Sequence, residues 1–187
     1  MGGVLTALLL APHNDDETLF ASFLLQRYEP LVVVCLRSQV QEDRYGITAA
    51  QREYETESAL RELGQVEHFL QLGHLDREVS WEDVRVSLAA LANVRQTYSP
   101  VIAPAWEDGG HDHHNGIASL AADIWGQDVL SYTTYTRHGG RTRSSEEVEP
   151  QPPWIAAKHR ALACYRTQIA EPSCRPWFLG DVREYVA

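Results

Sequence analysis

The sequence predicts an α/β fold in which a mostly parallel sheet carries helices on both faces, the three-layer Rossmann-like arrangement. Runs of apolar residues at 4–11, 31–36 and 101–105 lack the alternation of a half-exposed strand, as expected where a parallel sheet is buried on both sides. Segments with the spacing of amphipathic helices separate these runs, as expected of successive strand–helix–strand units. No change of composition divides the chain, so we expect one domain over residues 1–187.

The N-terminal half is expected to contain three strands and two helices. Pro30 ends the first helix, Thr48 is a candidate N-cap for the second, and Gly64 is a candidate stop. The elements expected in order are a strand at 4–11, a helix at 18–28, a strand at 31–36, a polar loop at 37–46, a helix at 48–63 and a strand at 66–70.

The C-terminal half continues the alternation and then becomes less regular. The elements expected are a helix at 81–98, a strand at 101–105, a helix that begins near His114, a strand at 129–136, a loop at 137–153 and a last helix around 158–165. The loop is rich in Gly, Ser, Pro and acids, and its composition fits a lid or a surface loop equally well. The apolar tail at 177–186 is expected to pack back on the domain or to meet another subunit, which leaves a homo-oligomer open.

Composition excludes several classes of function. A net charge of −10 over 187 residues disfavours binding to nucleic acid or to an anionic membrane, because the electrostatic contribution would be repulsive. The N-terminal apolar run is too short to span a bilayer and lacks the basic start of a signal peptide. Three cysteines without C-x-x-C spacing suggest reduced thiols and a cytoplasmic location.

A histidine and three acids follow the first predicted strand directly, as His13-Asn14-Asp15-Asp16-Glu17. Asn and Asp are good helix N-caps and acids favour the helix dipole, so a structural cap explains part of this run. It does not explain His13, nor two adjacent carboxylates that repel one another unless a cation or a proton lies between them. The run therefore predicts a metal and catalytic site at the carboxyl end of a strand, where open α/β sheets bind ligands.

A second polar cluster, His111-Asp112-His113-His114, follows the predicted strand at 101–105. His114 lies three positions before Ile117, on or beside the buried side of the helix that Ile117 begins. An isolated run of surface histidines would carry no function. Here both clusters occupy strand-to-helix turns of one parallel sheet, so we expect them to converge at one edge.

These residues resemble the PIG-L/LmbE-like zinc deacetylases. Residues 12–17 are similar to the P-H-P-D-D-E motif of that family, and residues 110–114 are similar to its H-P-D-H motif. The resemblance implies Zn²⁺ bound by two histidines and an aspartate, a general-base aspartate, a catalytic histidine and a supporting glutamate. Position by position, these are His13, Asp16 and His114 for the metal, Asp15 as base, His111 as catalytic histidine and Glu17 in support.

The second motif departs from the family at His113, which stands where the family has aspartate. That carboxylate would orient the catalytic histidine and raise its pKa, so its absence leaves the protonation of His111 open; Asp112 is a candidate substitute. A register with His113 on the metal is also open. We prefer His114, because the shifted register would put Gly116 where the helix needs an apolar residue. Asn14, where proline is usual, is a mild departure.

Further matches extend the resemblance over most of the chain. Arg52 belongs to an R-x-x-E…L-G pattern whose arginine commonly faces the substrate, although it could equally be a helix charge paired with Glu55. Asp76 belongs to an L-G-x-x-D pattern whose aspartate binds substrate hydroxyls, although it could equally cap its own turn. A K-x-x-A-L-x-x-Y pattern starts at Lys158. Trp106 is a candidate for stacking on a sugar.

The resemblance implies a zinc-dependent N-deacetylase of a small N-acetylated amino sugar or related conjugate. Zinc held by two histidines and one aspartate keeps a position open for water, and the same ligand set accepts Fe²⁺, cobalt or nickel. Two alternatives remain open. One is a metallohydrolase of another fold, such as the metallo-β-lactamases, and the other is a non-catalytic Rossmann-like binding protein whose acids and histidines only cap helices.

Overall fold

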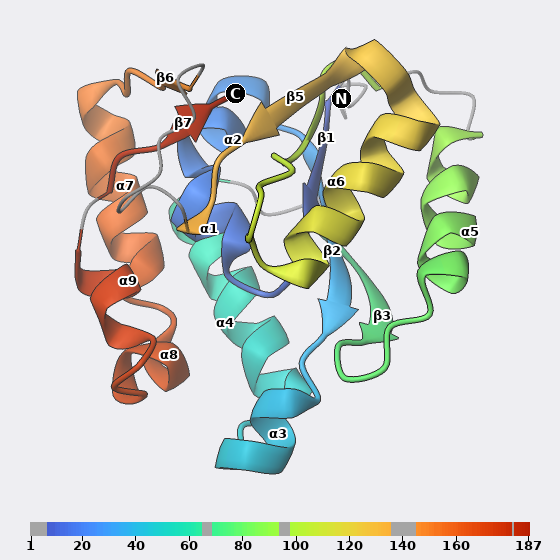
Figure 1. Ribbon diagram of the computed structural model, residues 1–187. Coiled ribbons are helices and arrows are strands. Elements are labelled where there is room, and N and C mark those ends of the chain that lie inside the picture. Colours follow the sequence, from blue (N-terminus) through green and yellow to red (C-terminus); the bar gives the residue numbers. More distant parts are fainter. Residues whose placement is uncertain (1–6, 65–68, 94–97, 136–144, 181) are drawn as a thin grey trace, which may run out of the picture.

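A mostly parallel sheet forms the centre of the molecule (Figure 1). The computed structural model describes residues 7–64, 69–93, 98–135, 145–180 and 182–187. Within them the strands lie in the order β3-β2-β1-β4-β5-β7-β6. Their bounds are β1 (Leu8–Ala11), β2 (Leu31–Arg37), β3 (Phe69–Leu75), β4 (Val101–Pro104), β5 (Val129–Tyr132), β6 (Glu146–Glu147) and β7 (Tyr185–Val186). β1 to β5 run parallel, and β7 is antiparallel to β5 and β6.

Helices cover both faces of the sheet. They are α1 (Asp16–Phe20), α2 (Ser22–Tyr28), α3 (Val40–Tyr45), α4 (Ala49–Glu62), α5 (Trp81–Ala92), α6 (Asp112–Trp125), the 3-10 turn η1 (Gly126–Asp128), α7 (Pro152–Leu162), α8 (Arg166–Ala170) and α9 (Arg175–Leu179). Leu8 and Leu10 of β1 pack with α5 and α6, whereas Leu9 and Ala11 pack with α1, α2, α4 and α7. This division follows from the alternation of side chains along a strand. The predicted three-layer fold is confirmed.

The order of the strands places the two polar clusters next to each other. β1 pairs with β2 on one side and with β4 on the other, through Leu8 with Leu31 and Leu8 with Val101. β2 and β3 thus lie on one side of β1, and β4 and β5 lie on its other side. A crevice forms between β1 and β4, where the strand order reverses. The turn after β1 and the turn after β4 both open into this crevice.

Several predicted boundaries are wrong, and contacts between distant residues explain the differences. The predicted helix at 18–28 breaks at Ala21, because Glu184 accepts hydrogen bonds from Ser22 Oγ and from the backbone N–H of Phe23. The predicted loop at 37–46 contains α3, whose N-cap residue Gln39 donates its N–H to Asp76.

Other boundaries shift by a few residues. β3 extends to Leu75, because it continues to pair with β2 as far as Arg37. Two residues of the predicted loop at 137–153 form β6, and α7 starts at Pro152. The capping box of Thr48 with Gln51 is present as expected. Parts of the predicted elements at residues 4–6, 66–68, 94–97 and 136–144 lie outside the described residues.

The tail packs back on the domain through a buried ion pair. Lys158 of α7 lies 2.6 Å from Glu184 and donates a second hydrogen bond to the carbonyl of Leu19 in α1. Both side chains are at most 1% exposed. The pair therefore joins α7, the residue directly before β7 and the α1–α2 break that follows the first polar cluster. No helix in the described part of the chain is long and apolar enough to cross a membrane.

We expect Lys158→Met to lower the free energy of unfolding by about 3–5 kcal/mol, because it leaves the Glu184 carboxylate buried without its cation. Urea denaturation measures the loss. Arg160→Met is the matched control, since Arg160 makes an exposed ion pair with Glu62 whose removal costs at most about 1 kcal/mol. Equal losses in the two variants would show that the buried pair does not hold the tail.

Candidate metal centre

The turn between β1 and α1 holds an unusual backbone conformation. Asp15 has φ 144° and ψ −24°, which side-chain-bearing residues rarely adopt. Its carbonyl accepts the N–H groups of Thr18 and Leu19 at 3.0 and 2.8 Å, and its own N–H donates to Glu17 at 3.1 Å. Strain of this kind costs on the order of 1–3 kcal/mol and is found most often at functional sites.

His13, Asp16 and His114 come together below this turn. Asp16 Oδ2 lies 3.2 Å from His13 Nδ1 and 3.3 Å from His114 Nε2, and it also accepts the backbone N–H of His13 at 2.8 Å. One donor atom from each of the three residues lies within 4.8 Å of the others. The first turn of α6 supplies His114, so the sheet brings the two sequence clusters together as expected.

The polar atoms of this group are buried without enough partners. Asp16 is 0% and His114 1% exposed, and among the described residues Asp16 Oδ1 and both ring nitrogens of His114 lack a hydrogen bond. The 3.3 Å approach of His114 Nε2 to Asp16 is close but is not hydrogen-bonded. Burial would raise the pKa of Asp16, but His114 and His13 outweigh it and hold that pKa well below its ordinary range. Two nitrogens and an ionised oxygen in such a place fit a divalent metal ion.

A second group of histidines shares one member with the first. His13 Nε2 lies 2.8 Å from His113 Nδ1, and one nitrogen from each of His13, His111 and His113 also lies within 4.8 Å of the others. This group has no carboxylate, and His111 is exposed at the mouth of the pocket. The distances therefore allow either His114 or His113 to be the metal ligand of the second motif. The negative charge of Asp16 favours the group that contains His114 for binding a cation.

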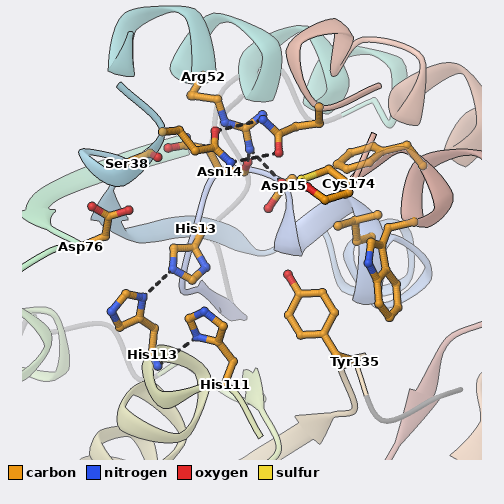
Figure 2. A pocket seen from close by; sticks show the side chains of 16 residues that line it. His13, Asn14, Asp15, Ser38, Arg52, Asp76, His111, His113, Tyr135 and Cys174 are labelled. Carbon is orange, nitrogen blue, oxygen red and sulfur yellow. Dashed lines mark hydrogen bonds and ion pairs between the residues drawn. The ribbon is translucent and has the colours of Figure 1, made fainter. Parts of the chain in front are cut away.

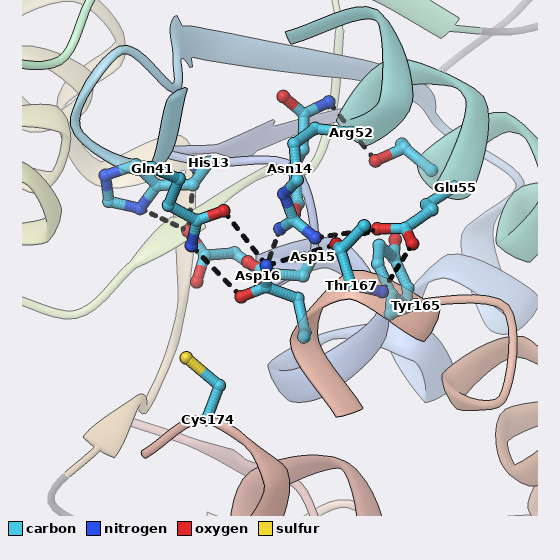
Figure 3. A network of polar contacts seen from close by, with 12 residues as sticks. His13, Asn14, Asp15, Asp16, Gln41, Arg52, Glu55, Tyr165, Thr167 and Cys174 are labelled. Carbon is cyan, nitrogen blue, oxygen red and sulfur yellow. Dashed lines mark hydrogen bonds and ion pairs between the residues drawn. The ribbon is translucent and has the colours of Figure 1, made fainter. Parts of the chain in front are cut away.

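Arg52 lies against the candidate base. Its guanidinium contacts Asp15 Oδ2 at 2.8 Å, Glu55 Oε2 at 3.0 Å and the carbonyl oxygen of Asn14, and it is 2% exposed (Figure 3). Arg52 lines the pocket and pairs with Glu55 while buried, so it is not the solvated helix charge of the alternative expectation, and its contact with a substrate stays a prediction. Burial raises the pKa of Asp15 to about 7, and Arg52 acts against this rise.

His111 caps the helix that carries His114. Its Nδ1 accepts the backbone N–H of His113 at 3.2 Å, so a neutral His111 ring carries its proton on Nε2. Partial burial, and then the electrostatic effect of the neighbouring His13, lower the pKa of His111 to about 4. Asp112, the candidate substitute for the missing motif aspartate, is exposed.

Glu17 and Asp76 take different positions. Glu17 is fully buried and accepts hydrogen bonds from Asp15 N, from Thr18 Oγ1 and from the hydroxyl of Tyr165, which places it behind the turn. Burial raises the pKa of Glu17. Asp76 lines the pocket and accepts the N–H of Gln39 at 2.7 Å, so this hydrogen bond joins two loops and does not cap the turn of Asp76 itself; its role toward substrate hydroxyls stays a prediction.

The pocket around these groups has a volume of about 270 Å³ (Figure 2). Four residues that were not predicted from the sequence line it together with the amide pair of Gln41 and Gln168; they are Tyr135, Cys174, Trp177 and Phe178. The apolar character of the tail pointed only to Trp177 and Phe178. Trp106, the residue expected to stack on a sugar, is 61% exposed and is not among the described lining residues.

Comparison with known proteins identifies the family. The model of the PIG-L family, described as GlcNAc-PI de-N-acetylase, matches residues 8–125, which is more than half of the chain. This chain belongs to the PIG-L family. The match contains both polar clusters, whereas Tyr135, Cys174 and Trp177 lie beyond it. No curated protein sequence matches the chain.

Solved structures of the same fold include proteins of low sequence identity. The conserved protein TT1542 from Thermus thermophilus is 23% identical, with a TM-score of 0.71 over 98% of this chain and 94% of that one. The A40926 pseudoaglycone deacetylase Dbv21 is 18% identical, with a TM-score of 0.73 over 98% and 96%. The N,N'-diacetylchitobiose deacetylase from Pyrococcus horikoshii is 18% identical, with a TM-score of 0.66 over 92% and 74%. The parallel sheet and the PIG-L membership argue against a metallo-β-lactamase fold.

We expect His114→Ala to lose bound zinc and His113→Ala to keep it, because only His114 belongs to the group that contains a carboxylate. The loss of affinity should exceed the roughly 10- to 100-fold that removal of a supporting residue causes. Elemental mass spectrometry of the purified, zinc-loaded variants measures the metal per chain. Loss of zinc from His113→Ala with retention in His114→Ala would establish the shifted register.

Proposed function

We propose that this PIG-L protein is a zinc-dependent N-deacylase that releases an acyl group, in the simplest case acetate, from an amino sugar or a related small conjugate. The observation that carries the proposal is the convergence of His13, Asp16 and His114 beside Asp15 in one pocket. The family description and the deacetylase names of two solved structures of the same fold support the reaction class.

The reaction is hydrolysis of an amide. A zinc ion held by His13, Asp16 and His114 would lower the pKa of a bound water and polarise the acyl carbonyl; Fe²⁺ could serve in its place. Asp15 accepts the proton of the water whose oxygen attacks the acyl carbon. The carbon–nitrogen bond then breaks, the amine nitrogen takes up the proton that Asp15 accepted from the water, and a carboxylate and a free amine are released.

His111 is assigned to the oxyanion that forms during the attack. Because its Nδ1 accepts the N–H of His113, its Nε2–H is the donor available to the pocket. Donation from Nε2 needs no net charge on the ring, so this role does not require the aspartate that His113 replaces. Asp112 is not needed for it.

Arg52 and Glu17 are assigned to positioning Asp15. Arg52 contacts the Asp15 carboxylate, and Glu17 accepts the Asp15 N–H, so the two residues hold the side chain and the backbone of the base. Asp76 is assigned to binding a hydroxyl group of the substrate from the wall of the pocket. The single domain, the homo-oligomer and the cytoplasmic location stay predictions from the sequence.

We expect Asp15→Asn to keep zinc but to lower the turnover of N-acetylglucosamine by roughly 10²- to 10⁴-fold, the usual contribution of a general base. Release of free amine measures turnover, and elemental analysis measures zinc. Asp123→Asn is the matched control, because Asp123 is exposed and forms a surface ion pair with Arg85. Normal turnover by Asp15→Asn would show that another group accepts the proton.

A further inference from the structure

The pocket has two chemically different ends, one on each side of the histidines (Figure 2). Ser38 and Asp76 form the polar end. The other end, called the apolar end, is lined mostly by apolar side chains, with Ser173 Oγ 3.9 Å from Cys174 Sγ; these side chains are Leu19, Tyr135, Cys174, Trp177 and Phe178. Figure 2 shows Ser38 and Asp76 across the histidines from Tyr135 and Cys174. A substrate bound at the metal centre would therefore extend toward both ends.

The apolar end begins directly at the metal centre. The Tyr135 ring stacks on the ring of His114 at a centroid distance of 5.2 Å and an angle of 29°. Trp177 packs edge-on against Tyr135 at 4.8 Å, and Phe20 contacts the same ring at 5.0 Å. Burial raises the pKa of the Cys174 thiol, so this side chain is uncharged and behaves as a small apolar group.

The polar end carries groups suited to hydroxyls. Ser38 and Asp76 are each 8% exposed, and Asp76 is held in place by the N–H of Gln39. A fixed carboxylate and a hydroxyl recognise a hydroxylated amine such as an amino sugar, whereas they offer little to a hydrocarbon. The amine-bearing part of the substrate is thus expected on this side, with the acyl group on the other.

We infer that the preferred acyl group is an apolar chain or ring larger than acetyl, held by Tyr135, Trp177 and Phe178, on an amine whose hydroxyls bind Ser38 and Asp76. An acetyl group would leave most of the aromatic surface in contact with water, and each added methylene would bury part of it. This inference rests on the proposed function. The bond broken and the products are the same, with a longer carboxylate in place of acetate.

The two ends also come from different parts of the chain. The polar end and the metal centre lie within residues 8–125, which match the PIG-L family. Four of the five apolar residues lie beyond that segment, at positions 135, 174, 177 and 178. The acyl preference would therefore depend on the C-terminal part of the chain, which the ion pair of Lys158 and Glu184 joins to α1 and α2.

The test compares the kcat/KM values of the zinc-loaded protein for N-acetyl-, N-butyryl- and N-hexanoylglucosamine, followed as free amine. We expect a rise of roughly fourfold per added methylene, from the free energy of about 0.8 kcal/mol for burying a methylene group. Trp177→Ala should lower the hexanoyl value at least about tenfold more than the acetyl value, since the larger loss of buried area falls on the longer chain. Trp106 is exposed and is not among the described residues that line the pocket, so Trp106→Ala should leave the three kcat/KM values unchanged.

Other variants and a binding measurement complete the test. Cys174→Phe fills the apolar end and should reverse the preference toward acetyl, which provides an answer if Trp177→Ala does not fold. Asp76→Asn should lower all three values by the same factor. Calorimetry provides a readout independent of turnover, in which hexanoate should bind the zinc-loaded protein more tightly than acetate.

Three results would contradict the account in different ways. A wild-type preference for acetyl over hexanoyl overturns the inference and leaves the proposed deacetylase intact. If Trp177→Ala lowered kcat/KM equally for all three substrates, the aromatic residues would bind the sugar and not the acyl group, which also overturns the inference. No turnover of any of the three overturns the proposed function itself.

Discussion

The buried carboxylate of Asp16 is the constraint on which the site depends. It is fully excluded from water, receives the N–H of His13 and lies within 3.3 Å of an imidazole nitrogen of both His13 and His114. Its other oxygen has no hydrogen bond from the residues that the structure describes. A buried charge with incomplete partners is costly unless a cation completes its surroundings. The strained turn at Asp15 and the first turn of α6 are the two pieces of backbone that hold this arrangement.

The order of the strands brings the two polar clusters together, and the C-terminal segments line part of the pocket beside them. Because β1 and β4 are neighbours at the point where the sheet order reverses, the loops after them meet although the clusters are about one hundred residues apart. Lys158 and Glu184 then fix the tail against α1 and α2, which brings α8 and α9 to the rim of the pocket. A contact far from the chemistry thus shapes the surface that a substrate would meet.

The sequence predicted the elements whose signals are local and missed those that depend on distant partners. Continuous apolar runs that end in histidines and acids were sufficient to predict the parallel sheet and the meeting of His13 with His114. The break at Ala21 could not be predicted, because its cause is Glu184, which bonds Ser22 from 162 positions away. Tyr135, Cys174 and Trp177 left no recognisable pattern, since apolar residues that line a pocket have the composition of a core. The dual role of Arg52, bonded to both Glu55 and Asp15, also required the structure.

The central claim is that the metal binds at the carboxylate-containing group of residues. The most direct measurement is an anomalous difference map, collected at the zinc absorption edge from crystals of the zinc-loaded protein. The account predicts one peak within bonding distance of a nitrogen of His13, an oxygen of Asp16 and a nitrogen of His114. A peak among His13, His111 and His113, or no peak at all, would contradict it.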